Sequence, residues 1–143
     1  MKKAFTLIEV MLVVGLTLAI GFLLTSFSGR FMAQSAVNDA SEQFRGAFNK
    51  AQAYSSSGRA DSSWGVHCAG SELTLFKGES YDGRDQSADE ISKINSHISV
   101  SGFEEIIFLH PDARPSKIIP NLEIRWDDLA QENISINSEG IVN

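Results

Sequence analysis

The chain has little cysteine, little proline and little positive charge, and each shortage bears on a structural feature or a class of partner. Cys68 is the single cysteine among 143 residues, so no disulfide can form within the chain. The three prolines all lie outside residues 5–54. Because proline interrupts helix interiors, this long proline-free stretch is free to form one continuous helix.

Positive charge is both scarce and scattered. The sequence has 12 Lys and Arg against 18 Asp and Glu, for a net charge of −6. The basic residues of its C-terminal part are interspersed with acids, at Arg59, Lys77, Arg84, Lys93, Arg114, Lys117 and Arg125. Because a nucleic-acid site needs clustered Lys and Arg to neutralise phosphates, we expect no direct binding of nucleic acid.

The sequence also lacks a recognisable catalytic pattern. No Ser-His-Asp order, paired-carboxylate site or phosphate-binding loop stands out. His67 precedes Cys68, but neighbouring residues on a strand point to opposite faces, which argues against a nucleophile–base pair. Cys68 is instead predicted to be a buried apolar thiol. We therefore predict a protein that is not an enzyme, with no catalytic residue and no cofactor.

Four acidic residues gather in one segment, at Asp82, Asp85, Asp89 and Glu90. Calcium takes several carboxylate oxygens, but this spacing does not match an EF-hand loop. The segment is therefore predicted to be a solvated acidic loop. His97 and His110 have no accompanying set of ligands and are predicted to lie at the surface or to be hydrogen-bonded, so no metal site is expected.

The most informative feature is a long apolar segment near the start of the chain. Residues 5–27 are interrupted by one carboxylate, Glu9, and are preceded by Lys2 and Lys3. At about 1.5 Å per residue the segment extends about 35 Å, enough to cross a hydrocarbon core about 30 Å thick. It is longer than the apolar region of a signal peptide, which has about 7–15 residues. The two lysines predict a cytoplasmic N-terminus.

The residues around Glu9 form a specific pattern, Lys2-Lys3-Ala4 followed by Phe5-Thr6-Leu7-Ile8-Glu9-Val10-Met11. This pattern resembles the processing site of type IV prepilins and pseudopilins. In that family a short basic leader is cut just before a Phe, and the fifth residue of the mature chain is Glu. The resemblance implies cleavage between Ala4 and Phe5 and N-methylation of Phe5. The chain departs from the family at Ala4, where Gly is usual, but Ala adds only one methyl group and cleavage is still expected.

The resemblance also suggests a role for Glu9. A charge at the centre of a membrane helix costs about 2.5–3.5 kcal/mol, and a desolvated carboxylate in a bundle of such helices must be paired. The natural partner is the α-amine of Phe5 on a neighbouring subunit. Before cleavage Phe5 has an amide nitrogen, so processing creates the cation that the buried anion needs. The alternative is that Glu9 lies at the level of the lipid headgroups and has no specific partner.

Apolar residues continue beyond the first segment at helical spacing. Their three- and four-residue intervals predict one face of a helix, formed by Val37, Ala40, Phe44, Ala47, Phe48, Ala51 and Tyr54. We therefore predict one helix from about residue 5 to residue 55. Phe44, Phe48 and Tyr54 are expected to pack against the rest of the protein.

The remaining sequence reads as short strands joined by turns. The predicted strands are 64–68, 73–77, 97–101, 104–109, 122–126 and 134–136, with a short piece at 141–142. An antiparallel sheet packed on a helix is the economical architecture. The predicted fold class is α+β, with a long N-terminal helix, membrane-spanning in its first half, packed on a small antiparallel sheet. The predicted divisions are a leader (1–4), a transmembrane and assembly helix (5–27), its amphipathic continuation (28–56) and a β-rich head (57–143).

Two C-terminal segments, residues 107–115 (IFLHPDARP) and 134–140 (ISINSEG), resemble the GspH/FimT type of minor pseudopilin. The resemblance implies a structural subunit in a type IV pilus or in a type II secretion or competence pseudopilus. A minor subunit is expected, and a major subunit is the alternative. The implied partners are other pilin or pseudopilin subunits, the prepilin peptidase and methyltransferase, an inner-membrane assembly platform and the membrane itself.

The expected location is the inner membrane, as a single-pass protein with a cytoplasmic N-terminus and an extracytoplasmic head, and then the pilus or pseudopilus. The alternative is a signal-anchored membrane protein with an extracytoplasmic binding domain. This alternative predicts binding or catalytic residues in the head, and it gives Glu9 no role.

Overall fold

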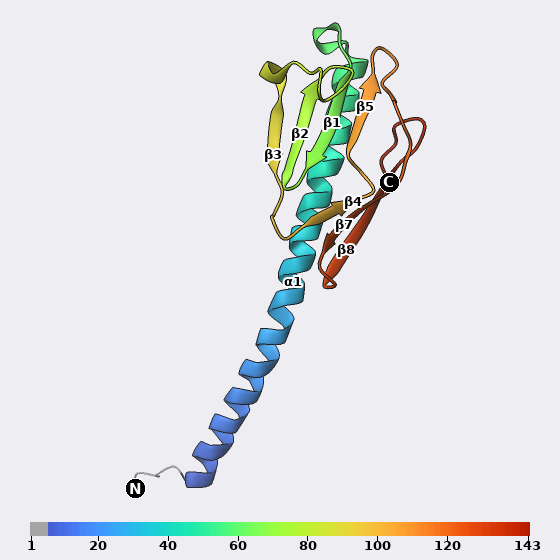
Figure 1. Ribbon diagram of the computed structural model, residues 1–143. Coiled ribbons are helices and arrows are strands. Elements are labelled where there is room, and N and C mark those ends of the chain that lie inside the picture. Colours follow the sequence, from blue (N-terminus) through green and yellow to red (C-terminus); the bar gives the residue numbers. More distant parts are fainter. Residues whose placement is uncertain (1–5) are drawn as a thin grey trace.

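The protein is built around one long helix that carries a β-rich head on its C-terminal half (Figure 1). The computed structural model describes residues 6–143, with the backbone alone for residues 23–28. The helix, α1 (Leu7–Ser56), runs for 50 residues without a break, or about 75 Å. It agrees with the helix predicted from about residue 5 to residue 55. The predicted cleavage site, between Ala4 and Phe5, lies outside the described residues.

The end of α1 is closed by local structure. The backbone N–H of Ser57 donates to the carbonyl of Ala53, and Gly58 then adopts the left-handed conformation with φ 66°. Glycine has no Cβ to oppose that conformation, so it commonly follows a helix end. A short 3₁₀ helix, η1 (Arg59–Asp61), leads into the first strand.

Five strands of the head form one antiparallel sheet, the large sheet, in the order β3-β2-β1-β5-β6. In chain order they are β1 (Trp64–Ala69), β2 (Glu72–Lys77), β3 (Glu90–Lys93), β5 (Glu105–Leu109) and β6 (Arg114–Pro115). The hairpin of β1 and β2 pairs Trp64 with Lys77. β3 lies at one edge and has β2 as its neighbour.

Three further strands form a separate antiparallel sheet, the small sheet, in the order β4-β7-β8. They are β4 (Ser99–Ser101), β7 (Ile119–Trp126) and β8 (Ala130–Ile136). The predicted α+β class with antiparallel pairing is therefore confirmed, but the prediction of one sheet is wrong. One of the points where the chain passes between the sheets is Gly102, between β4 and β5, whose φ is 77° and where an added Cβ would lie 2.3 Å from the carbonyl oxygen of Asn121.

Several strand boundaries also differ from the prediction. β3 and β6 were not predicted, and the strand expected at 97–101 begins at Ser99. A turn precedes it, because the Asn95 side chain accepts from the backbone N–H of His97 at 3.0 Å. The piece expected at 141–142 is a single bridge between Ile136 and Val142.

The hydrophobic core lies between α1 and the two sheets. Successive turns of α1 bury Val37, Ala40, Phe44, Phe48 and Ala51. They pack with side chains from both sheets, among them Val66, Leu75, Ile106, Phe108, Leu122, Ile124, Ile134 and Ile136. The predicted packing of Phe44 and Phe48 is confirmed, and Tyr54 is half-buried with its ring 4.8 Å from that of Trp64.

The prediction of a single-pass inner-membrane protein is wrong. Within the described residues, no helix combines the length and the apolar character needed to span a bilayer.

The central position of Phe48 leads to a stability prediction. We expect Phe48→Ala to lower the free energy of unfolding by about 3–5 kcal/mol, because it leaves a cavity between α1 and both sheets. Urea unfolding followed by the fluorescence of the buried Trp64 measures the change. The neighbouring exposed change Asn49→Ala is the control and should stay within about 0.5 kcal/mol of the unchanged protein. Equal effects from the two changes would contradict the assigned core.

Candidate assembly surface

The first half of α1 projects away from the head (Figure 1), and its large apolar side chains are exposed. Every described side chain from Leu7 to Phe22 is exposed, and the large apolar ones range from 49% for Ile20 to 82% for Leu7. They do not keep to one stripe, since the consecutive residues Leu12, Val13 and Val14 point in directions about 100° apart around the helix. A helix that is apolar all round is normally buried.

The start of α1 gives Glu9 a local role that the sequence-based prediction missed. Thr6 caps the helix, and its hydroxyl accepts from the backbone N–H of Glu9 at 3.4 Å. Thr6 and Glu9 are three residues apart, which is the spacing of a capping box. The carboxylate also lies in the first turn, where the helix dipole favours negative charge. The Thr-x-x-Glu pattern was the available signal in the sequence.

The surroundings of Glu9 on the helix surface are apolar. Together with Val10, Val13 and Val14 it lines a shallow hollow of about 260 Å³. Glu9 is exposed and forms no ion pair with any described residue. Its predicted partner, the Phe5 amine, lies outside the described residues. The Thr17 hydroxyl, about two turns further along the helix, donates to the carbonyl of Val13 at 2.6 Å.

The exposed half of α1 ends abruptly where the head begins. Phe31 and Met32 are 77% and 64% exposed, whereas Ala33 is fully buried. From Ala33 onward one face of the helix is covered by the head. Phe31 and Met32 are therefore the last large apolar side chains on the uncovered part.

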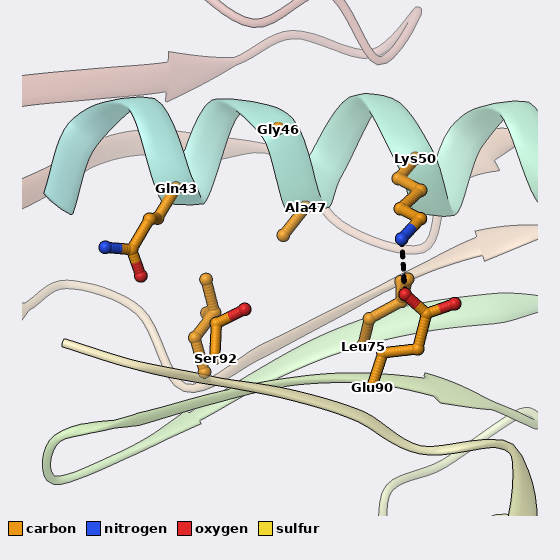
Figure 2. Close-up of a pocket in the computed structure, with 8 residues that line it drawn as sticks. Gln43, Gly46, Ala47, Lys50, Leu75, Glu90 and Ser92 are labelled. Atoms are coloured by element: carbon orange, nitrogen blue, oxygen red, sulfur yellow. Dashed lines mark hydrogen bonds and ion pairs between the residues drawn. The ribbon is translucent and has the colours of Figure 1, made fainter. Parts of the chain in front are cut away.

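A groove lies beside α1 at the edge of the large sheet, and Figure 2 shows it in close-up. Gln43, Gly46, Ala47 and Lys50 line it from the helix, four residues at the spacing of one helical face. Leu73 and Leu75 of β2 and Glu90 and Ser92 of β3 line it from the sheet. Its volume is about 280 Å³.

The groove is closed at one end by an ion pair between Lys50 and Glu90 (Figure 2). The hydroxyl of Tyr54 also donates to Glu90, at 3.4 Å. The hydrogen bond to Glu90 raises the pKa of Lys50 above its ordinary value. Both charged side chains are substantially exposed, so solvent screens the pair and its contribution to stability is small. The groove is open at its other end, between Gln43 and Ser92.

The segment predicted to be a solvated acidic loop instead forms ion pairs with basic side chains. Arg84 donates from Nε to Asp89 at 2.9 Å and also lies over the Tyr81 ring. Lys77 pairs with Asp85 at 3.6 Å, and hydrogen bonds from Ser87 lower the pKa of Asp85. A short 3₁₀ helix, η2 (Gln86–Ala88), lies within the segment. The described residues contain no group of acidic, His or Cys side chains suited to a metal.

His110 joins the end of α1 to the turn after β5. Its Nδ1 lies 2.8 Å from the carbonyl oxygen of Ser55, and its Nε2 lies 3.3 Å from the carboxylate of Asp61. The Ser55 hydroxyl donates to the carbonyl of Phe108 at 2.8 Å and faces a backbone group, not the imidazole. These residues therefore connect elements and do not form a nucleophilic triad. His97, the other histidine predicted to lie at the surface or to be hydrogen-bonded, stacks its ring on that of Trp126.

Cys68 is half-buried rather than fully buried, which corrects the sequence-based prediction. It lies near the end of β1, where Phe103 and the turn at Gly70 line a hollow beside it. Its neighbour His67 stacks on Tyr81 with the ring centroids 3.7 Å apart. Partial burial raises the pKa of the Cys68 thiol, which disfavours the nucleophilic thiolate form.

Comparison with known proteins finds no matching family model, no matching curated sequence and no matching solved structure. The resemblance to prepilins and pseudopilins therefore stays a prediction that depends on the N-terminal residues.

The state of Cys68 can be tested by alkylation. Because its pKa is raised, we expect iodoacetamide to modify it more slowly at pH 8 than an exposed cysteine, with a rate that still increases above pH 9. Mass spectrometry over time measures the rate. The control is Ser138→Cys in a Cys68→Ser background, which places a thiol in an exposed turn. Equal rates at the two positions would show that the Cys68 thiol is not shielded.

Proposed function

We propose that the chain is a structural subunit of a helical filament, either a type IV pilus or a type II secretion or competence pseudopilus. It belongs to the minor class of such subunits, of the GspH/FimT type. Its leader is removed between Ala4 and Phe5 by a prepilin peptidase that also methylates the new N-terminus. Its partners are other subunits of the same kind and the platform that assembles them.

The observation that carries this proposal is the uncovered first half of α1. Its apolar side chains are exposed on several sides of the helix, and burial of each large one in a partner would be worth about 1.5–3 kcal/mol. A single neighbouring surface covers one side only. A bundle of like helices covers all sides, which is the arrangement that a helical filament provides.

Glu9 supports the same proposal on electrostatic grounds. Inside such a bundle its carboxylate would lose water, and a desolvated charge needs a partner of opposite sign. The described residues supply none in the single chain. The α-amine of Phe5 on a neighbouring subunit would supply one, and only after cleavage. Assembly would then depend on processing.

The alternative, a signal-anchored membrane protein with a binding domain, has less support. No observation on the head favours a particular small ligand, and the groove beside α1, at about 280 Å³, is just below the volumes typical for small-molecule sites, roughly 300–1,000 Å³.

The proposal predicts two results in cells that produce the full chain. Intact-mass spectrometry should find a mature protein that begins at a methylated Phe5. Glu9→Gln, and likewise Glu9→Ala, should still be cleaved but should be lost from sheared filaments at least about tenfold, because losing one buried ion pair costs more than 1.4 kcal/mol. Quantitative immunoblotting of the filament fraction measures the loss.

Glu72→Gln is the matched control, since it removes an exposed acid from β2 by the same chemical change. It should enter filaments as the unchanged chain does. A protein that keeps Met1 at its N-terminus, together with normal incorporation of both Glu9 variants, would show that the proposed function is wrong.

A further inference from the structure

The groove beside α1 has the shape of a receptor for one or two apolar side chains. Its floor is apolar, because Leu73 and Leu75 are almost fully buried beneath it. On the helix side, the groove has open space at Gly46, where an added Cβ would meet no atom within 4 Å. Polar groups stand around it, with Lys50 and Glu90 at the closed end and Gln43 at the open end (Figure 2). An apolar centre within a polar rim is the usual composition of a protein–protein contact.

The chain also carries side chains that fit such a groove. Phe31 and Met32 lie on the same helix and are largely exposed. They cannot reach the groove of their own chain, because Phe31 and Ala47 are 16 residues apart on a continuous helix, or about 24 Å. Only a second copy can bring them there.

The charges around the two features are complementary. Arg30 is the only basic residue of α1 before Arg45, and it forms no ion pair with a described residue. Asp39 and Glu42 are exposed and lie four residues before Gln43 and Gly46, on the helix face that lines the groove. If Phe31 of one copy lies level with Ala47 of another, Arg30 lies level with Gly46, one helical turn from Glu42.

We propose that Phe31 and Met32 of one copy insert into the groove between α1 and β3 of a second copy, with the two helices parallel and offset by about 24 Å. Arg30 of the inserting copy then pairs with Glu42 of the receiving copy, and Asp39 adds to the favourable field. This contact rests on the proposed function, since it assigns one interface within the filament.

The proposed contact has a direct consequence for assembly. The inserting and receiving surfaces are different, so each copy keeps a free groove when it inserts and a free pair of apolar side chains when it receives. Such a head-to-tail contact is heterologous, so it leaves one surface of each copy open to a further subunit.

The first test places a photo-crosslinking amino acid at position 31 of the full chain in the cells that produce it. After irradiation we expect a covalent dimer of the chain. Mass spectrometry of its peptides should locate the adduct in residues 43–50, 72–77 or 90–93. Adducts confined to other parts of the chain, or to a different protein, would overturn the proposal.

The second test fills the groove without weakening the fold. Gly46→Leu puts a large side chain into the open space above Ala47, and it should raise the melting temperature because glycine is a poor helix former. The yield of the position-31 dimer should nevertheless fall at least about tenfold, since an apolar anchor loses its site. Gly46→Ala is the matched control, which should also raise the melting temperature but leave most of the dimer. Equal dimer yields from the two variants would count against the groove.

A charge exchange tests the polar part of the contact. Arg30→Glu should lower the dimer yield several-fold, and Arg30→Glu combined with Glu42→Arg should restore most of it. If the double variant is no better than the single one, the pairing of these residues is wrong.

The outcomes separate this proposal from the proposed function. Filaments that form normally while the position-31 adduct lies outside the groove would overturn the interface alone. A chain that keeps its leader and enters no filament would overturn the proposed function, and the interface with it.

Discussion

The packing of the second half of α1 against both sheets is the interaction on which the rest of the structure depends. The large and small sheets meet the same helix face, and Phe103, in the link between β4 and β5, contacts Phe44 and Phe48 with ring centroids 5.8 and 5.4 Å away. Edge-to-face aromatic pairs of this kind add to the stabilisation from burial alone. Because the sheets are separate, α1 is the element that holds them in one head.

This arrangement gives one helix two different tasks. From Ala33 onward, one face of α1 is buried against the two sheets of the same chain. Before Ala33 the helix continues without tertiary support, because nothing in the described part of the chain folds back to cover it. The rigid connection between the two halves means that any partner of the uncovered half is placed at a defined distance from the head.

The sequence was a good guide to the features that depend on local periodicity. The three- and four-residue spacing of Val37, Phe44 and Phe48 predicted both the helix and its buried face, and alternation from Leu122 to Trp126 predicted β7. It was a poor guide to short edge strands. β3 has one neighbouring strand and largely exposed side chains, so its sequence lacks the apolar alternation that marks a strand.

Ion pairs and hydrogen bonds between distant residues could not be predicted at all. Lys50 meets Glu90 across 40 positions, and His110 reaches Ser55 across 55.

The sequence by itself determined the long helix, its apolar and polar faces, and the position of Glu9 within its first turn, because helical periodicity and capping act between residues no more than a few positions apart. Only the tertiary structure decided that the head has two sheets, that the acidic segment is held by Arg84 and Lys77, and that a groove remains open beside Gly46. Those features arise where segments far apart in the chain are brought together by burial of a shared core, and no local pattern encodes the distances between them.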